Sequence, residues 1–129
     1  CTSKDIVRVK KVIASLILDG KKFPMFDYIC SPKQGLRGKP APDQLLNTIA
    51  FCNVDPHETF YVGDMESDYH CANRAGVDFV HASYGYGEFE CSLKIQSIKA
   101  IKELLDEYQQ DTNLQDLKVN LWLPYSELP

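Results

Sequence analysis

The sequence predicts an α/β fold in which a parallel sheet forms from strands that alternate with helices. Residues 26–30, 59–62 and 79–81 are short apolar runs, rich in the aromatic and β-branched residue types that fill buried strands. Stretches with helical apolar spacing separate these runs, and Gly, Asp or Pro marks the joints between them. This alternation is typical of a parallel sheet with helices packed against it.

The first part of the chain predicts one helix, one strand and one loop. Ser3 or Asp5 can cap a helix that runs to about Leu18, because apolar residues recur there at helical spacing. The strand 26–30 comes next. A loop rich in Gly, Lys and Arg follows it over residues 31–38.

The middle of the chain predicts a second helix and then two strands. Pro42 suits the first turn of that helix, and Asp55-Pro56 marks the turn back toward the sheet. The strands 59–62 and 79–81 follow, with a helix between them. Strands joined in this way by a crossover helix lie parallel.

The end of the chain predicts a short strand at 93–96 and an amphipathic helix capped by Ser97. Apolar and polar residues alternate over 117–123, which indicates one more strand. We therefore divide the chain into a core over residues 1–110 and a tail over residues 111–129.

Composition narrows the classes of protein that fit. A chain of 129 residues with 44% apolar residues can build one core, and a net charge of −4 without a basic block disfavours nucleic acid as a partner. No apolar run reaches membrane-spanning length, so no membrane partner is expected. The five cysteines are odd in number and lack paired spacing, which indicates free thiols in a reducing compartment and a cytoplasmic location.

The sequence around residue 64 carries the clearest chemical signal. The strand 59–62 leads into Gly63 and Asp64, and a helix begins at Ser67 and Asp68 and ends at Gly76. Gly63 permits a sharp turn and the close approach of another group. Asp64 follows the carboxyl end of a strand, where open α/β sheets bind ligands. Two carboxylates across this turn can converge on one cation, and oxygen ligands favour magnesium over zinc.

A second interpretation of these carboxylates is open at this point. Asp64 and Asp68 also suit the start of a helix, where the helix dipole stabilises acidic side chains. The ten residues from 59 to 68 do not separate the two interpretations, and the decision depends on other motifs.

Three motifs in order resemble the haloacid dehalogenase superfamily of phosphohydrolases, and above all its phosphoglycolate-phosphatase-like branch. The chain opens on Cys-Thr-Ser-Lys, where Thr2 matches the family's second motif, a Thr or Ser that ends a strand. Lys39 begins a Lys-Pro-Ala-Pro stretch, like the third motif. Residues 63–68 read Gly-Asp-x-x-x-Asp, like the fourth motif. The resemblance covers about residues 1–105 and implies part of a three-layer, Rossmann-like core.

The resemblance implies a role for each matching residue. Thr2, with Ser3, would bind a phosphoryl oxygen, and Lys39 would place its ammonium beside the phosphate and the nucleophile. Asp64 would be a direct ligand of Mg²⁺, and Asp68 either a second ligand or an outer partner of Lys39 or of a metal-bound water. Taken alone, Thr2 is an ordinary strand end or helix cap, and Lys39 a solvated loop charge.

The family's first motif, Asp-x-Asp, which supplies the nucleophile, occurs nowhere in the 129 residues. We therefore interpret the chain as the C-terminal part of a longer protein. The intact protein is expected to be a magnesium-dependent phosphatase of a small phosphorylated metabolite, acting through an aspartyl-phosphate, whereas this chain alone is expected to be inactive. The alternative is a non-catalytic domain of the same fold that serves binding or assembly.

Several other side chains are expected to be structural or solvated. Lys33 and Arg37 fit solvated loop charges, His70 and His81 fit partly buried structural residues, and Cys71 fits an inert position on the apolar side of its helix.

The missing first motif also leaves a gap in the expected sheet. In the family's strand order two absent strands lie between 26–30 and 59–62, a space of ~14 Å. Each backbone group left unsatisfied there costs ~1–3 kcal/mol, against a total stability of ~5–15 kcal/mol. We expect polypeptide from outside residues 1–129, above all the protein's own N-terminal part, to fill this gap. The fallback is a rearranged sheet that includes 117–123.

Overall fold

The computed structural model describes residues 1–15, 17–18, 21–22 and 26–110. Its main sheet has three parallel strands in the order β3 (Phe60–Gly63), β4 (Asp78–Ala82) and β5 (Lys94–Ile95). The predicted parallel α/β sheet is therefore confirmed for this part of the chain. The tail 111–129, with the strand predicted at 117–123, lies outside the described residues.

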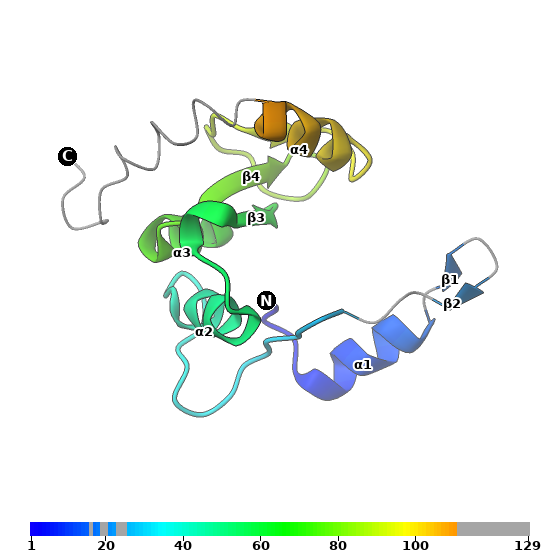
Figure 1. The fold of residues 1–129 in the computed structure, drawn as a ribbon. Helices are drawn as coiled ribbons and strands as arrows, with labels where there is room; N and C mark the ends of the chain where they lie inside the picture. The colour runs from blue at the N-terminus through cyan, green and yellow to red at the C-terminus, as the bar shows by residue number, and fades with distance from the viewer. Residues whose placement is uncertain (16, 19–20, 23–25, 111–129) are drawn as a thin grey trace.

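Three helices accompany this sheet: α2 (Asp43–Cys52), α3 (Glu66–Ala75) and α4 (Ala100–Gln110). In Figure 1, β4 lies between α3 and α4. Pro42 directly precedes α2 rather than lying in its first turn, and Gly76 ends α3 after Ala75, as predicted. α4 begins three residues after Ser97, whose carbonyl oxygen accepts the Ala100 N–H in a preceding turn. No helix of the described residues is long and apolar enough to cross a membrane.

The core forms where α2, α3 and the strands meet. Small residues give α3 a close fit to its neighbours, because Cys71 and Ala72 are completely buried and Ala75 is nearly so. Together with α2 and the entry to β4 they form one apolar cluster: Leu45, Ile49, Cys71, Ala72, Ala75, Val77 and Phe79. Burial of this cluster orients α3, so that its first turn lies at the carboxyl end of β3.

The amino-terminal helix is shorter than predicted. α1 spans Ile6–Ser15 and Asp5 accepts the Arg8 N–H at its start, but the expected end at Leu18 is wrong. Ile17–Leu18 form β1, which pairs antiparallel with β2 (Lys21–Lys22). α1 buries none of its residues, so tertiary packing does not extend it. Figure 1 shows α1 and this hairpin extending away from the main sheet.

The strand predicted at 26–30 is also wrong, because the structure has no β-strand in that segment. A strand requires a neighbour to complete its hydrogen-bond ladder, and β3 does not fill that role. The Cys30 carbonyl oxygen instead accepts the Thr2 N–H at 2.9 Å. Within the described part of the chain, β3 pairs only with β4. All four residues of β3 are half-buried, whereas four of the five in β4 are buried.

The end of α3 provides a test of the fold. Gly76 has a φ of 71°, in the left-handed region that side chains with a Cβ disfavour. We expect Gly76→Ala to lower the free energy of unfolding of the intact protein by about 1–2 kcal/mol, measured by urea denaturation. Gly38→Ala is the matched control, since Gly38 has no positive φ and an added Cβ there meets nothing within 4 Å. Equal destabilisation by both substitutions would contradict the assignment.

Candidate functional site

Parallel strands bring several polar residues to one edge of the sheet. β3 and β4 run in the same direction, so the residues that follow each strand lie at the same edge. Asp64 follows β3 directly, and the loop 83–87 follows β4. The first turn of α3, which contains Asp68, begins at this edge as well.

A buried ion pair joins Asp68 to the loop before α2. The Lys39 Nζ lies 2.5 Å from Asp68 Oδ1, and the two side chains are only 14% and 6% exposed. The Tyr61 hydroxyl donates to the same oxygen at 3.3 Å, and the Met65 N–H donates to Oδ2 at 3.2 Å. Protein donors therefore satisfy both carboxylate oxygens, as a buried carboxylate requires.

The strand β3 is shaped to receive Asp68. Tyr61 and Gly63 lie on the same face of the strand, two residues apart, and a Cβ on Gly63 would lie 2.6 Å from Asp68 Oδ2. The predicted close approach at Gly63 is therefore confirmed, and the approaching group is this carboxylate. Burial, and then the charge of Asp68, raise the pKa of Tyr61 far above its ordinary value. Tyr61 accordingly stays protonated and acts as a donor.

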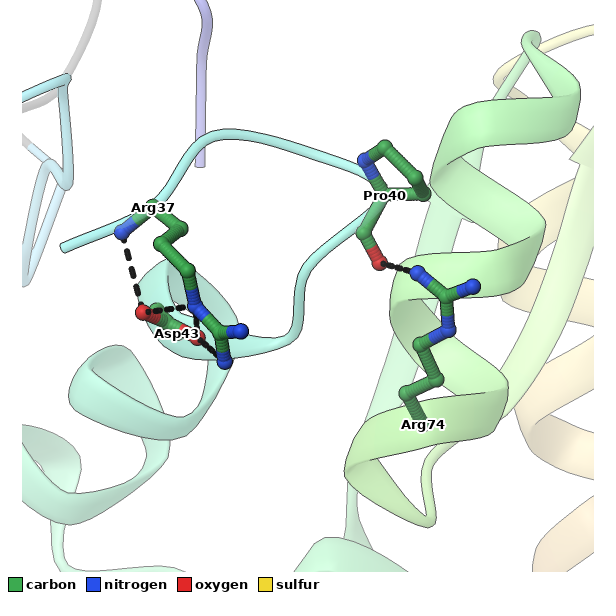
Figure 2. A network of polar contacts seen from close by, with 4 residues as sticks. All are labelled: Arg37, Pro40, Asp43 and Arg74. Carbon is green, nitrogen blue, oxygen red and sulfur yellow. Dashed lines mark hydrogen bonds and ion pairs between the residues drawn. The ribbon is translucent and has the colours of Figure 1, made fainter.

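Two arginines hold the loop that presents Lys39, as Figure 2 shows. The Arg37 guanidinium donates to both carboxylate oxygens of Asp43, with contacts of 2.8–3.2 Å, and its backbone N–H donates to Oδ2. On the other side of Lys39, Arg74 of α3 donates to the Pro40 carbonyl oxygen at 3.1 Å. Arg37 is therefore an anchor of this loop, and its side chain is 76% exposed, so the predicted solvated position is confirmed.

Asp64 is fixed through one of its two carboxylate oxygens. Its Oδ2 accepts the Tyr86 N–H at 2.9 Å, and Oδ1 accepts no hydrogen bond from the described residues. The side chain is half-buried at the sheet edge. A carboxylate oxygen in this position has the chemistry of a ligand for a hard cation such as Mg²⁺.

Thr2 lies against α2 rather than in the ion pair. Its carbonyl oxygen accepts from the Gln44 side chain at 3.3 Å, and its hydroxyl accepts the Lys4 N–H at 3.1 Å. Among the described residues, no hydrogen bond or ion pair joins Thr2 or Asp64 to Lys39 and Asp68.

The other side chains considered from the sequence differ in how far they are buried. His81 is almost fully buried, but His70 is exposed beside Glu66, so the partly buried position expected for His70 is wrong. Cys71 is buried, and burial raises the pKa of its thiol, consistent with an inert role. Ser3 is exposed. The one three-ligand group in the described part of the chain is Asp55, His57 and Glu58, which is separate from Asp64 and Asp68.

Sequence reasoning missed Tyr61, Arg74 and Asp43 as parts of this site. A signal existed for Tyr61, because a phenol on a buried strand needs a hydrogen-bond partner, and Gly63 on the same face leaves room for one. Arg74 carries no such local signal, because it reaches Pro40 across 34 residues. Asp43 does carry one, since it stands at the start of a helix only six residues after Arg37.

Comparison with known proteins identifies relatives of this chain. The family model described as haloacid dehalogenase-like hydrolase matches residues 2–82, more than half of the chain. A phosphoglycolate phosphatase from Pseudomonas putida KT2440 is 42% identical over 48 residues, which are 37% of this chain and 18% of that protein. A probable phosphoglycolate phosphatase from Pseudomonas putida is 31% identical over 88 residues, 64% of this chain and 35% of that protein.

A solved structure is also similar. It is a HAD-superfamily hydrolase of subfamily IA, variant 1, from Geobacter sulfurreducens PCA, with 29% identity and a TM-score of 0.48. The match covers 53% of this chain and 34% of that one. The chain thus spans about a third or less of the length of each of these relatives.

The Arg37 anchor predicts a titration that can be measured. Hydrogen bonds from Arg37 lower the pKa of the Asp43 carboxyl from an ordinary 3.8 to about 2. The pairing therefore contributes to stability above pH 3.8 and is lost as the pH falls through about 2. We expect an NMR titration of the Asp43 carboxyl carbon to show this low midpoint, and Arg37→Gln to return it toward 3.8. Arg74→Gln is the control, since Arg74 contacts Pro40 instead. An ordinary midpoint in the unmodified protein would contradict the anchor.

Proposed function

Because the chain belongs to the haloacid dehalogenase-like hydrolase family, we propose that the intact protein is a magnesium-dependent phosphatase of a small phosphorylated metabolite. The names of the two Pseudomonas relatives make 2-phosphoglycolate the first substrate to test. The free state of all five cysteines supports a reducing, cytoplasmic setting.

The observation that carries this proposal is the buried pair of Lys39 and Asp68. Phosphoryl transfer depends mainly on positioning and on neutralising the charge of the phosphoryl oxygens. An ammonium has three donors, and Asp68 fixes this one at the sheet edge while leaving other donors for a phosphate. An ammonium held in place before the reaction stabilises developing negative charge without reorganisation. Thr2 and Ser3 would complete the phosphate contacts.

Asp64 and Asp68 would have different roles in binding Mg²⁺. Oδ1 of Asp64, without a donor among the described residues, fits a direct ligand. Both oxygens of Asp68 already accept hydrogen bonds, which favours its role as the partner of Lys39. When bound, Mg²⁺ would neutralise phosphoryl charge. In this proposal Asp64 would position the cation directly. Asp68 would contact the cation only through a metal-bound water.

The nucleophile would come from the rest of the intact protein, because no Asp-x-Asp occurs in these 129 residues. The proposed aspartyl-phosphate therefore forms on an aspartate outside this chain, and the chain alone is inactive. The half-buried edge strand β3 supports the same view. We propose that further polypeptide of the same protein packs beside β3 and supplies both the missing strands and the nucleophile.

The activity is tested on the intact protein. We expect phosphate release from 2-phosphoglycolate that depends on added magnesium. Tight binding of phosphorylated compounds without any turnover would instead identify the non-catalytic binding domain, for which the absent Asp-x-Asp motif is the supporting observation.

Lys39 provides the second test. Lys39→Met keeps the length of the side chain but removes the charge, so we expect kcat/KM to fall by about 10²–10³. Lys33→Met is the matched control, because Lys33 is an exposed lysine of the same loop. Phosphatase kinetics measure both variants, and near-equal activity of the two would exclude the role of Lys39.

Asp64 provides the third test of the proposed function. Asp64→Asn removes an anionic oxygen from a hard cation, so we expect magnesium affinity to fall sharply, measured by calorimetric titration of Mg²⁺ into the intact protein. Asp106→Asn, at an exposed position of α4, should leave the affinity unchanged. An unaltered magnesium titration of Asp64→Asn would remove Asp64 from the ligand set.

A further inference from the structure

The loop that follows β4 is in direct contact with Asp64. Besides the Tyr86 N–H on Oδ2, two glycines of the loop lie against this residue. A Cβ on Gly85 would lie 2.3 Å from the Asp64 Cβ, and one on Gly87 would lie 2.1 Å from the Asp64 carbonyl oxygen. No side chain fits at these distances, so the position of the loop and the position of Asp64 determine each other.

His81, from β4, makes a hydrogen bond to this loop. It is the fourth residue of β4 and is 3% exposed, and its Nε2 lies 3.0 Å from the Gly87 carbonyl oxygen. A carbonyl oxygen only accepts, so Nε2 carries the hydrogen. Nδ1 is buried and has no hydrogen-bond partner among the described residues. The Phe89 ring, 4.2 Å away between centroids, packs against the imidazole and limits its rotation.

We infer that His81 is a positioning residue for Asp64. Its Nε2–H fixes the Gly87 carbonyl, and the loop then presents the Tyr86 N–H to Asp64 Oδ2. That hydrogen bond occupies one carboxylate oxygen and sets the orientation of the other, Oδ1, toward a cation. The consequence for metal binding rests on the proposed function, whereas the chain of contacts from His81 to Asp64 does not. Outer partners of metal ligands commonly act in this way.

Two substitutions of His81 separate positioning from simple space filling. His81→Gln keeps an N–H donor at a similar reach, whereas His81→Leu removes it and keeps an apolar side chain. Hydrogen exchange of the Tyr86 amide, followed by NMR in the intact protein, reads the contact with Asp64 directly. We expect slow exchange in the unmodified protein and in His81→Gln, and fast exchange in His81→Leu. His70→Leu is the control at an exposed histidine of α3.

Magnesium affinity is the second measurement. We expect His81→Leu to weaken it by about tenfold or more, with the affinity largely restored in His81→Gln. Slow Tyr86 exchange together with unchanged affinity in His81→Leu would overturn the inference. Failure of the unmodified protein to bind magnesium would count against the proposed function, while the exchange measurement would still test the contacts of His81.

The unmodified protein supplies a test that needs no variant. The ¹⁵N signals of His81 should show hydrogen on Nε2 and a bare Nδ1. Hydrogen on Nδ1 with a bare Nε2 would overturn the inference even if His81→Leu failed to fold.

Discussion

The buried carboxylate of Asp68 is the constraint on which the geometry of the candidate site depends. A charge that is 6% exposed is stable only when donors surround it, and here they come from three separate elements. Lys39 comes from the loop before α2, Tyr61 from β3, and the Met65 N–H from the start of α3. Removal of one partner of a buried ion pair typically costs about 3–5 kcal/mol, a large part of the stability of a domain. The ion pair therefore ties the loop, the strand and the helix into one arrangement.

Glycines allow the acidic groups to approach the backbone so closely. Gly63 lets Asp68 lie on the end of β3, and Gly85 and Gly87 let the loop after β4 lie on Asp64. The two aspartates thus have different partners: Asp68 accepts from a lysine, a tyrosine and the Met65 N–H, whereas Asp64 accepts from the Tyr86 N–H. This difference is the basis for the unequal roles that the two carboxylates have in the proposed function, where Asp68 holds the lysine and Asp64 is the proposed metal ligand.

Much of the fold between residues 42 and 110 could be predicted from the sequence, because there the local signals agree with the packing. Pro42 and Gly76 stand at helix ends, and the apolar runs at 59–62 and 79–81 become neighbouring strands. The predictions of a helix at 17–18 and of a strand at 26–30 were wrong for one reason. The residue types favour a longer helix and a strand, but α1 buries no residue and 26–30 has no neighbouring strand, so tertiary contacts that would select those states are absent from the described structure.

For the site, the sequence by itself determined which residue types stand at the carboxyl ends of the strands. Order and spacing singled out Lys39, Asp64 and Asp68, and the family resemblance follows from the same residues. Only the tertiary structure decided which of them touch. The partner of Asp68 lies 29 residues away in the chain and that of Asp64 22 residues away, and the anchor of the Lys39 loop on Arg74 spans 34 residues. Such pairings depend on how α2 and α3 pack and on how the strands align, which no local pattern encodes.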